Sequence, residues 1–161
     1  MTKLPTPFNS ALETGVRSLF ILEASFPSSF DVQRLIEFDY LVVHSGDADG
    51  PDSLHTPLPL RAGELLVRRE LINRGLLLMM SRGLVERLTT RAGIEYRATE
   101  KAAPYLASLA TPYALRLHEL ARWAVERFGH EPTEVIRIIT QQFFERWSSQ
   151  FQSLLPPREA R

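Results

Sequence analysis

The sequence predicts a mainly helical α+β chain: a winged helix-turn-helix with a β-hairpin wing and additional C-terminal helices. Three observations predict this class. Apolar residues recur at spacings of three and four along most of the chain, as they do on one face of a helix. Residues 84–97 instead alternate apolar and polar side chains around a glycine-containing turn. Three helical stretches precede this hairpin, and that order is typical of winged helices.

The first two helices carry start signals. Ser10 and Glu13 are spaced as a capping box, which predicts a helix that begins after Ser10 and is ended by Pro27. Asp31 is the expected N-cap of a second helix that reaches Val43.

Residues 44–60 form a long connection whose prolines and glycines oppose regular structure. A loop this long inside a compact domain is usually functional or interface-forming. It contains two histidines, three aspartates and no Lys or Arg. These groups could bind a divalent metal, but their spacing matches no known site. The favoured interpretation is a turn-rich loop whose Asp side chains bind local backbone amides.

A third helix is expected over residues 61–82, with Gly75 as a potential break. The hairpin follows, and Thr99 is expected to cap a helix that reaches about Leu109. Thr111 and Pro112 open the next helix, with Gly129 placed just past its end.

The last helix is expected to start near residue 132 and to stop at Pro156. We therefore divide the chain into an N-terminal tail (1–8), a winged-helix domain (9–110) that contains the 44–60 loop, a C-terminal helical pair (111–155) and a disordered tail (156–161).

The composition excludes several classes of protein. The 161 residues contain 19 Lys+Arg and 19 Asp+Glu, so a protein that coats DNA by charge alone is excluded. With 44% apolar residues the chain is not disordered. The absence of cysteine excludes disulfides and thiolate metal sites and fits a cytoplasmic protein. No apolar run approaches the length of a membrane span, so we expect no membrane partner.

Although the net charge of the chain is zero, one segment of it is basic. Between residues 61 and 97 there are eight Arg and four Glu, and the rest of the chain is acidic. The hairpin contributes three candidate contacts to DNA phosphates, which are Arg87, Arg91 and Arg97. The alternative is a solvated charged face, in which Glu64–Arg68 and Glu70–Arg74 pair along the helix.

The third helix does not resemble a reader of DNA bases. Its centre, Leu76–Met80, is five consecutive large apolar residues, which spread around the whole helix and leave no wide polar face. Two explanations stay open: a core helix, or a helix that contacts a protein partner through an adaptable methionine-containing surface.

The sequence contains none of the phosphate-binding, dinucleotide-binding, zinc-protease or nucleophile-elbow motifs that indicate catalysis. We therefore expect neither enzymatic activity nor a cofactor.

Several stretches together resemble the middle component of bacterial ABC-three-component systems, the Lamassu-type anti-phage defence modules. They are Phe8–Gly15, Asp39–Asp47, Ser53–His55, Arg61–Arg69, Gly75–Leu76 and Ser81–Val85, and the likeness runs from about Phe8 to Phe151. The resemblance implies a small subunit that bridges or regulates an ATPase similar to the structural-maintenance-of-chromosomes family, with a coiled coil, and a toxic effector, often a nuclease. It supplies no catalytic residues to carry over.

From the residues we select candidate partner contacts in the acidic loop, along the third helix and on the aromatic stripe of the last helix. They are His44, Asp47, Asp49, His55, Arg61, Glu64, Arg68, Arg69, Leu76, Met79, Met80, Phe143, Trp147 and Phe151. For the aromatic stripe, ordinary core packing is the alternative.

Two other functions stay open at this point. A stand-alone winged-helix transcription regulator would bind its own promoter at physiological salt. A metal-dependent hydrolase would require Asp47, Asp49 and His55 to bind the metal together.

Overall fold

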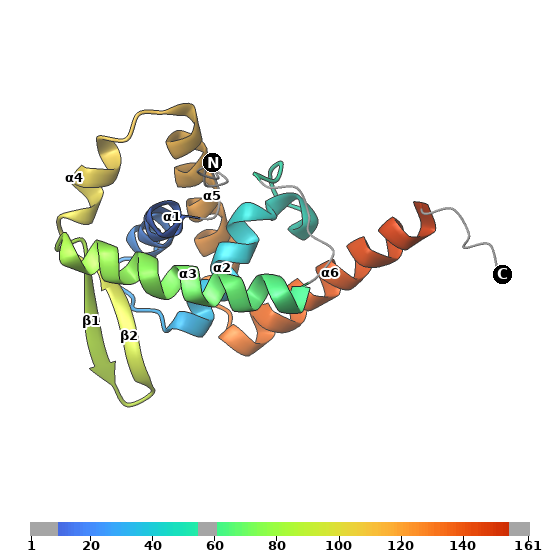
Figure 1. Ribbon diagram of the computed structural model, residues 1–161, viewed down its shortest axis with the longest axis horizontal. Coiled ribbons are helices and arrows are strands. Elements are labelled where there is room, and N and C mark those ends of the chain that lie inside the picture. The colour runs from blue at the N-terminus through green and yellow to red at the C-terminus, as the bar shows by residue number, and fades with distance from the viewer. Residues whose placement is uncertain (1–9, 55–60, 155–161) are drawn as a thin grey trace, which may run out of the picture.

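A computed structural model describes residues 10–54 and 61–154, except for the side chains of 47, 61–66, 144 and 147–154. The elements are α1 (Ala11–Ala24), α2 (Val32–Val43), the 3₁₀ helix η1 (Ser45–Ala48), α3 (Arg61–Ser81), β1 (Val85–Thr90), β2 (Gly93–Ala98), α4 (Ala102–Ala107), α5 (Pro112–Phe128) and α6 (Thr133–Leu154) (Figure 1). The predicted class is confirmed, because a mainly helical chain carries one antiparallel hairpin after its third long helix.

Three predicted helix starts are confirmed by side-chain caps. Ser10 Oγ accepts the Glu13 amide at 3.1 Å, Asp31 Oδ1 accepts the Arg34 amide at 2.7 Å, and Thr111 Oγ1 accepts the Ala114 amide at 3.1 Å. Each bond satisfies an amide that has no partner within its own helix.

Two predicted boundaries were wrong. α1 ends at Ala24 rather than at Pro27, and the amides of residues 25 and 26 bond back to its last turn. Thr99 is not the N-cap of α4, because the helix begins at Ala102 and Lys101 is its N-cap; Thr99 Oγ1 accepts the Lys101 amide at 3.3 Å, before the helix begins, and donates to Gly83 O at 2.6 Å. The predicted end of α5 is confirmed, because the helix ends at Phe128 and Gly129 directly follows it; Gly129 has a right-handed φ of −62°, so the left-handed freedom of glycine is not used there.

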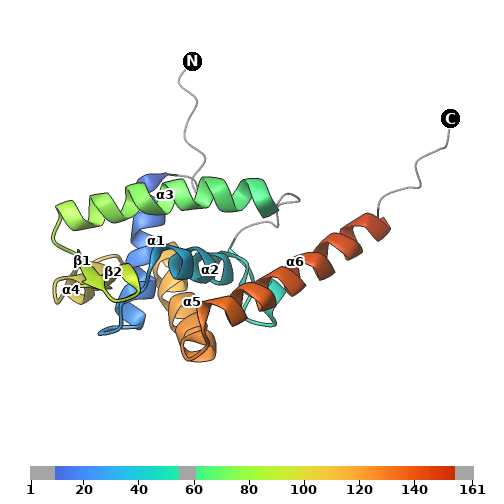
Figure 2. The same cartoon turned by 90° about the horizontal axis from the view of Figure 1, so that it is seen from below.

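Gly75 does not break α3. It lies buried where α3 crosses α1, and a Cβ atom on Gly75 would lie 2.6 Å from the backbone nitrogen of Gly15. The reciprocal Cβ on Gly15 would lie 2.8 Å from Gly75 O. Two glycines therefore let the helix backbones touch, and Figure 2 shows α3 lying across one end of α1.

The core joins side chains from α1, α2, α3 and α5. Its largest fully buried members include Leu19, Ile21, Phe38, Leu41, Ile72, Leu76, Met79, Leu117 and Leu120. This packing fixes the inner face of α3 and leaves its outer face to solvent.

α6 packs against α2 and η1 through its first half, where Ile136 is fully buried. Its second half runs away from the other helices in both views (Figures 1 and 2). Within the described ranges, no helix combines the length and the apolar character that crossing a membrane requires.

Candidate interaction surfaces

The outer face of α3 carries a stripe with two large apolar side chains. Val67, Glu70, Arg74, Leu77 and Ser81 follow one another at spacings of three and four, and all are exposed. Val67 is 55% exposed and Leu77 64%. Between them Arg74 Nη2 lies 2.8 Å from Glu70 Oε1, as the predicted i,i+4 pair. We call these five residues the α3 stripe.

The apolar run of α3 is divided between core and surface. Leu76 and Met79 are buried, Leu78 and Met80 are half-buried, and only Leu77 is exposed. The five residues do spread around the helix, because consecutive positions lie 100° apart, but α3 has packed neighbours on one side only and Leu77 is left on its outer face. Leu76 and Met79, which we selected as partner contacts, belong to the chain's own core.

A buried ion cluster attaches α3 to α1 and α2. Arg17 Nε donates to Asp39 Oδ1 at 2.9 Å, and Arg68 donates to Asp39 Oδ2. Burial by itself raises the pKa of Asp39, but the charges and hydrogen bonds of Arg17 and Arg68 outweigh burial and hold that pKa at about 2. Arg68, another selected contact, therefore lies inside the fold rather than on its surface.

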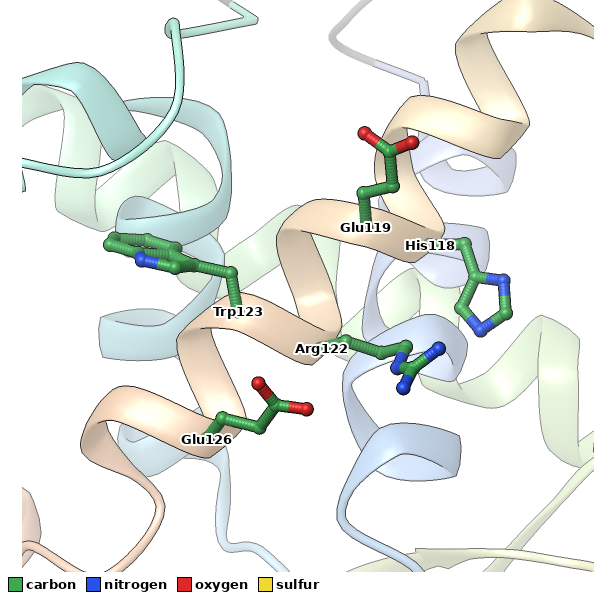
Figure 3. A pocket seen from close by; sticks show the side chains of 5 residues that line it. All are labelled: His118, Glu119, Arg122, Trp123 and Glu126. Carbon is green, nitrogen blue, oxygen red and sulfur yellow. The ribbon is translucent and has the colours of Figure 1, made fainter.

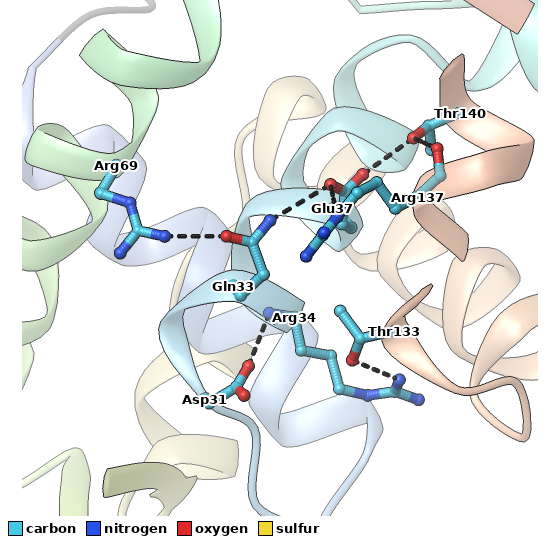
Figure 4. Close-up of polar contacts among 8 residues, drawn as sticks. All are labelled: Asp31, Gln33, Arg34, Glu37, Arg69, Thr133, Arg137 and Thr140. Atoms are coloured by element: carbon cyan, nitrogen blue, oxygen red, sulfur yellow. Dashed lines mark hydrogen bonds and ion pairs between the residues drawn. The ribbon is translucent and has the colours of Figure 1, made fainter. Parts of the chain in front are cut away.

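A second polar chain joins α3, α2 and α6 (Figure 4). Arg69 Nη2 donates to Gln33 Oε1 at 2.8 Å, and Gln33 Nε2 donates to Glu37 Oε1 at 3.3 Å. Buried Glu37 accepts from Thr140 Oγ1 at 2.8 Å, and Arg137 Nε lies 3.8 Å from its other oxygen. Arg69 is exposed, as a partner contact requires, but its guanidinium is already hydrogen-bonded to Gln33 on α2.

Arg34 attaches α2 to the turn between α5 and α6. Its guanidinium donates to Gly129 O at 2.9 Å, to Glu131 O at 2.8 Å and to Thr133 Oγ1 at 3.2 Å. Cations near the C-terminus of a helix stabilise its unpaired carbonyls. Arg34 thus fixes the direction in which α6 leaves the body.

The described part of the 44–60 loop is a compact, self-bonded turn. Ser45 Oγ donates to Pro51 O at 2.8 Å, and Ser53 Oγ accepts the Gly46 amide at 2.8 Å. Serine hydroxyls make these bonds, and not the carboxylates of Asp49 or Asp52 as predicted.

The selected loop residues do not form one surface. His44 is buried, with its ring 4.8 Å from that of Tyr40, whereas Asp49 is exposed. The side chain of Asp47 and all of His55 lie outside the described residues. Within the described ranges, His, Asp and Glu side chains do not gather in groups of three that could hold a metal ion.

The packing of this loop on α5 was not predicted. A Cβ on Gly50 would lie 2.2 Å from Trp123 Cζ2, so the indole lies directly on the Gly50 backbone. Arg116 Nη2 also donates to Asp52 O at 2.8 Å. Sequence alone does not predict this contact, because a loop glycine and an aromatic residue on a later helix meet only in the tertiary structure.

The hairpin has two chemically different faces. Cross-strand partners share a face, and Arg87 is paired with Tyr96 whereas Glu86 is paired with Arg97. Arg97 Nη2 lies 2.6 Å from Glu86 Oε1. Arg91 is exposed in the turn between the strands. The three arginines predicted to contact phosphate therefore do not form one surface.

On α6, Phe143 is half-buried against the core, and the guanidinium of Arg146 lies 5.4 Å from its ring. The side chains of Trp147 and Phe151, and those of Arg61 and Glu64 on α3, lie outside the described residues.

A shallow hollow of about 280 Å³ lies on α5 and is lined by His118, Glu119, Arg122, Trp123 and Glu126 (Figure 3). Its two ring side chains pack on buried phenylalanines of the core: His118 stacks on Phe20 at 5.8 Å, and Trp123 packs edge-on against Phe128 at 5.9 Å.

Comparison with known families identifies this chain's relatives. Residues 7–150 match the family model described as ABC-three component (ABC-3C) system Middle Component 2. The chain belongs to this family. As a middle component it has a role in a multi-protein anti-phage defence system, as the resemblance implied. No curated protein and no solved structure matches the chain.

Proposed function

We propose that this middle component is a non-catalytic subunit of a Lamassu-type complex, which bridges an ATPase similar to the structural-maintenance-of-chromosomes family and an effector, often a nuclease. Family membership supports a role among several proteins. The observation that carries the bridging role is the α3 stripe.

The α3 stripe fits another helix better than it fits DNA bases. A recognition helix that reads bases presents Arg, Asn, Gln or Lys to the groove. Here Val67 and Leu77 are each more than half exposed, and an ion pair separates them. Spacings of three and four along one stripe are those by which two helices pack side by side. The coiled coil of the ATPase would supply the second helix.

The stripe is also held rigidly. Gly15 and Gly75 bring α3 against α1, and the buried Asp39–Arg68 pair attaches it to α2. A surface that is already ordered loses little conformational entropy when a partner binds. This rigidity supports α3 as a preformed docking helix.

α6 supplies a second region for a partner. Its second half runs clear of the body (Figure 2), and the spacing of large apolar residues continues in the sequence through Trp147 and Phe151. One subunit could therefore contact two proteins at once, through α3 and through α6.

Co-expression with the neighbouring genes, followed by pull-down, tests the proposal. We expect an ATPase to co-purify with the wild-type chain and a Leu77→Glu variant to lose most of it. Leu115→Glu is the matched control, since Leu115 on α5 is 55% exposed and lies outside the stripe. Failure of any neighbouring ATPase to co-purify with the wild type would contradict the bridging role. Nanomolar binding to its own promoter would favour a transcription regulator instead.

A further inference from the structure

The charges of the hairpin separate by face. Both acids of the hairpin, Glu86 and Glu95, lie on the face that also carries Arg97. Glu86 Oε1 accepts from Arg97 Nε at 2.7 Å, and Glu95 Oε1 accepts from Ser29 Oγ at 3.3 Å. This face therefore carries a net charge of −1, and its three charged groups are already hydrogen-bonded.

The opposite face is cationic and without acids. Cross-strand pairing places Arg87 with Tyr96, between the pairs Val85–Ala98 and Thr89–Ile94. Arg87 is exposed, and among the described residues no carboxylate pairs with it.

The turn holds a second exposed arginine in a defined place. Gly93 has a φ of +122°, which glycine adopts readily, so β2 can begin directly after Arg91 and Ala92. Thr90 Oγ1 accepts the Ala92 amide at 3.1 Å and donates to Gly93 O at 3.1 Å. These bonds order the backbone that carries Arg91, for which the described residues again provide no acidic partner.

We propose that the Arg87 face of the hairpin, together with Arg91 at its tip, binds the phosphate backbone of double-stranded DNA, and that Arg97 takes no part. Two exposed guanidiniums a few residues apart suit the closely spaced charges of a duplex. The hairpin offers no array of base-reading side chains, so the contact is independent of DNA sequence. It is separate from the α3 stripe, so it goes beyond the bridging role.

Fluorescence anisotropy with a labelled 30-base-pair duplex tests this inference on the full chain. We expect measurable binding of the wild type at low salt, weakened steeply by added salt. The Arg87→Ala/Arg91→Ala variant should bind several-fold more weakly at low salt, and its slope of log affinity against log salt should be smaller by about two. Arg97→Ala is the matched control, with the same residue type on the same hairpin, and should bind like the wild type.

Three results would overturn the inference: no binding by the wild type at low salt, no loss in the double variant, or an equal loss in Arg97→Ala. Loss of ATPase co-purification in the double variant with unchanged DNA binding would also overturn it, because the arginines would then serve an acidic protein surface. Pull-down and anisotropy are read separately, so failure here leaves the bridging role standing. Circular dichroism establishes that each variant is folded.

Discussion

Replacing Gly75 with alanine tests the crossing of α1 and α3. The added Cβ would lie 2.6 Å from Gly15 N, 2.7 Å from Gly15 Cα and 2.9 Å from Ala11 O, all backbone atoms that no rotamer change can move. Ordinary contact begins at 3.4 Å, so the closest pair must separate by 3.4 − 2.6 = 0.8 Å, which shifts one helix against the other.

Two effects of opposite sign decide the result. Alanine in place of glycine favours a helix by about 1 kcal/mol. Overpacking a well-packed core typically costs about 1–3 kcal/mol, and more when backbone must move. Because only backbone opposes the new methyl group, we expect a clash cost near the upper end of that range, so Gly75→Ala should lower the free energy of unfolding by about 2 kcal/mol.

Urea unfolding followed by circular dichroism at 222 nm measures this change. Asn73→Ala is the control, since Asn73 is exposed on the same helix and alanine there should slightly stabilise. Gly15→Ala should destabilise as Gly75→Ala does, and the double variant should lose less than the sum, because one methyl group already separates the helices. A Gly75→Ala variant as stable as the wild type would refute the close crossing.

The remaining predictions concern the buried ion cluster and the loop on α5. The pKa of Asp39 is about 2 in the fold against 3.8 ordinarily, so its carboxylate contributes about 2 kcal/mol of stability above pH 4, which is lost as the pH falls from about 4 to 2. In Asp39→Asn this acid-dependent part of the stability should be absent. The free energy of unfolding at pH 7 should also fall by about 3–5 kcal/mol, because two buried guanidiniums lose their anion. Urea unfolding midpoints measured against pH test both effects, and a variant whose stability depends on acid pH as the wild type's does would contradict the cluster. Gly50→Ala should displace the Trp123 ring, since its Cβ would lie 2.2 Å from Cζ2. In a Trp147→Phe background Trp123 is the only indole, and a red-shifted emission is expected, whereas an unchanged spectrum would contradict the contact.

Local chemistry in the sequence determined where most elements begin. Ser10, Asp31 and Thr111 are N-caps because short side-chain oxygens reach amides two or three residues ahead, and that geometry needs no tertiary partner. The hairpin was predictable for the same reason, since strand alternation and a turn glycine are properties of adjacent residues. The match over residues 7–150 likewise rests on the sequence alone.

Only the tertiary structure decided which side of each element is free. Gly75 lies at a helix contact rather than at a break in α3, because α1 crosses α3 there. On the same helix Leu77 faces solvent, whereas Leu76 and Met79 face the core. Strand register determines which side chains share a face, so Arg97 pairs with Glu86, whereas Arg87 has no acidic partner among the described residues. Spacing along one chain establishes which residues are neighbours on an element, but contacts between distant segments determine which of them a partner can reach.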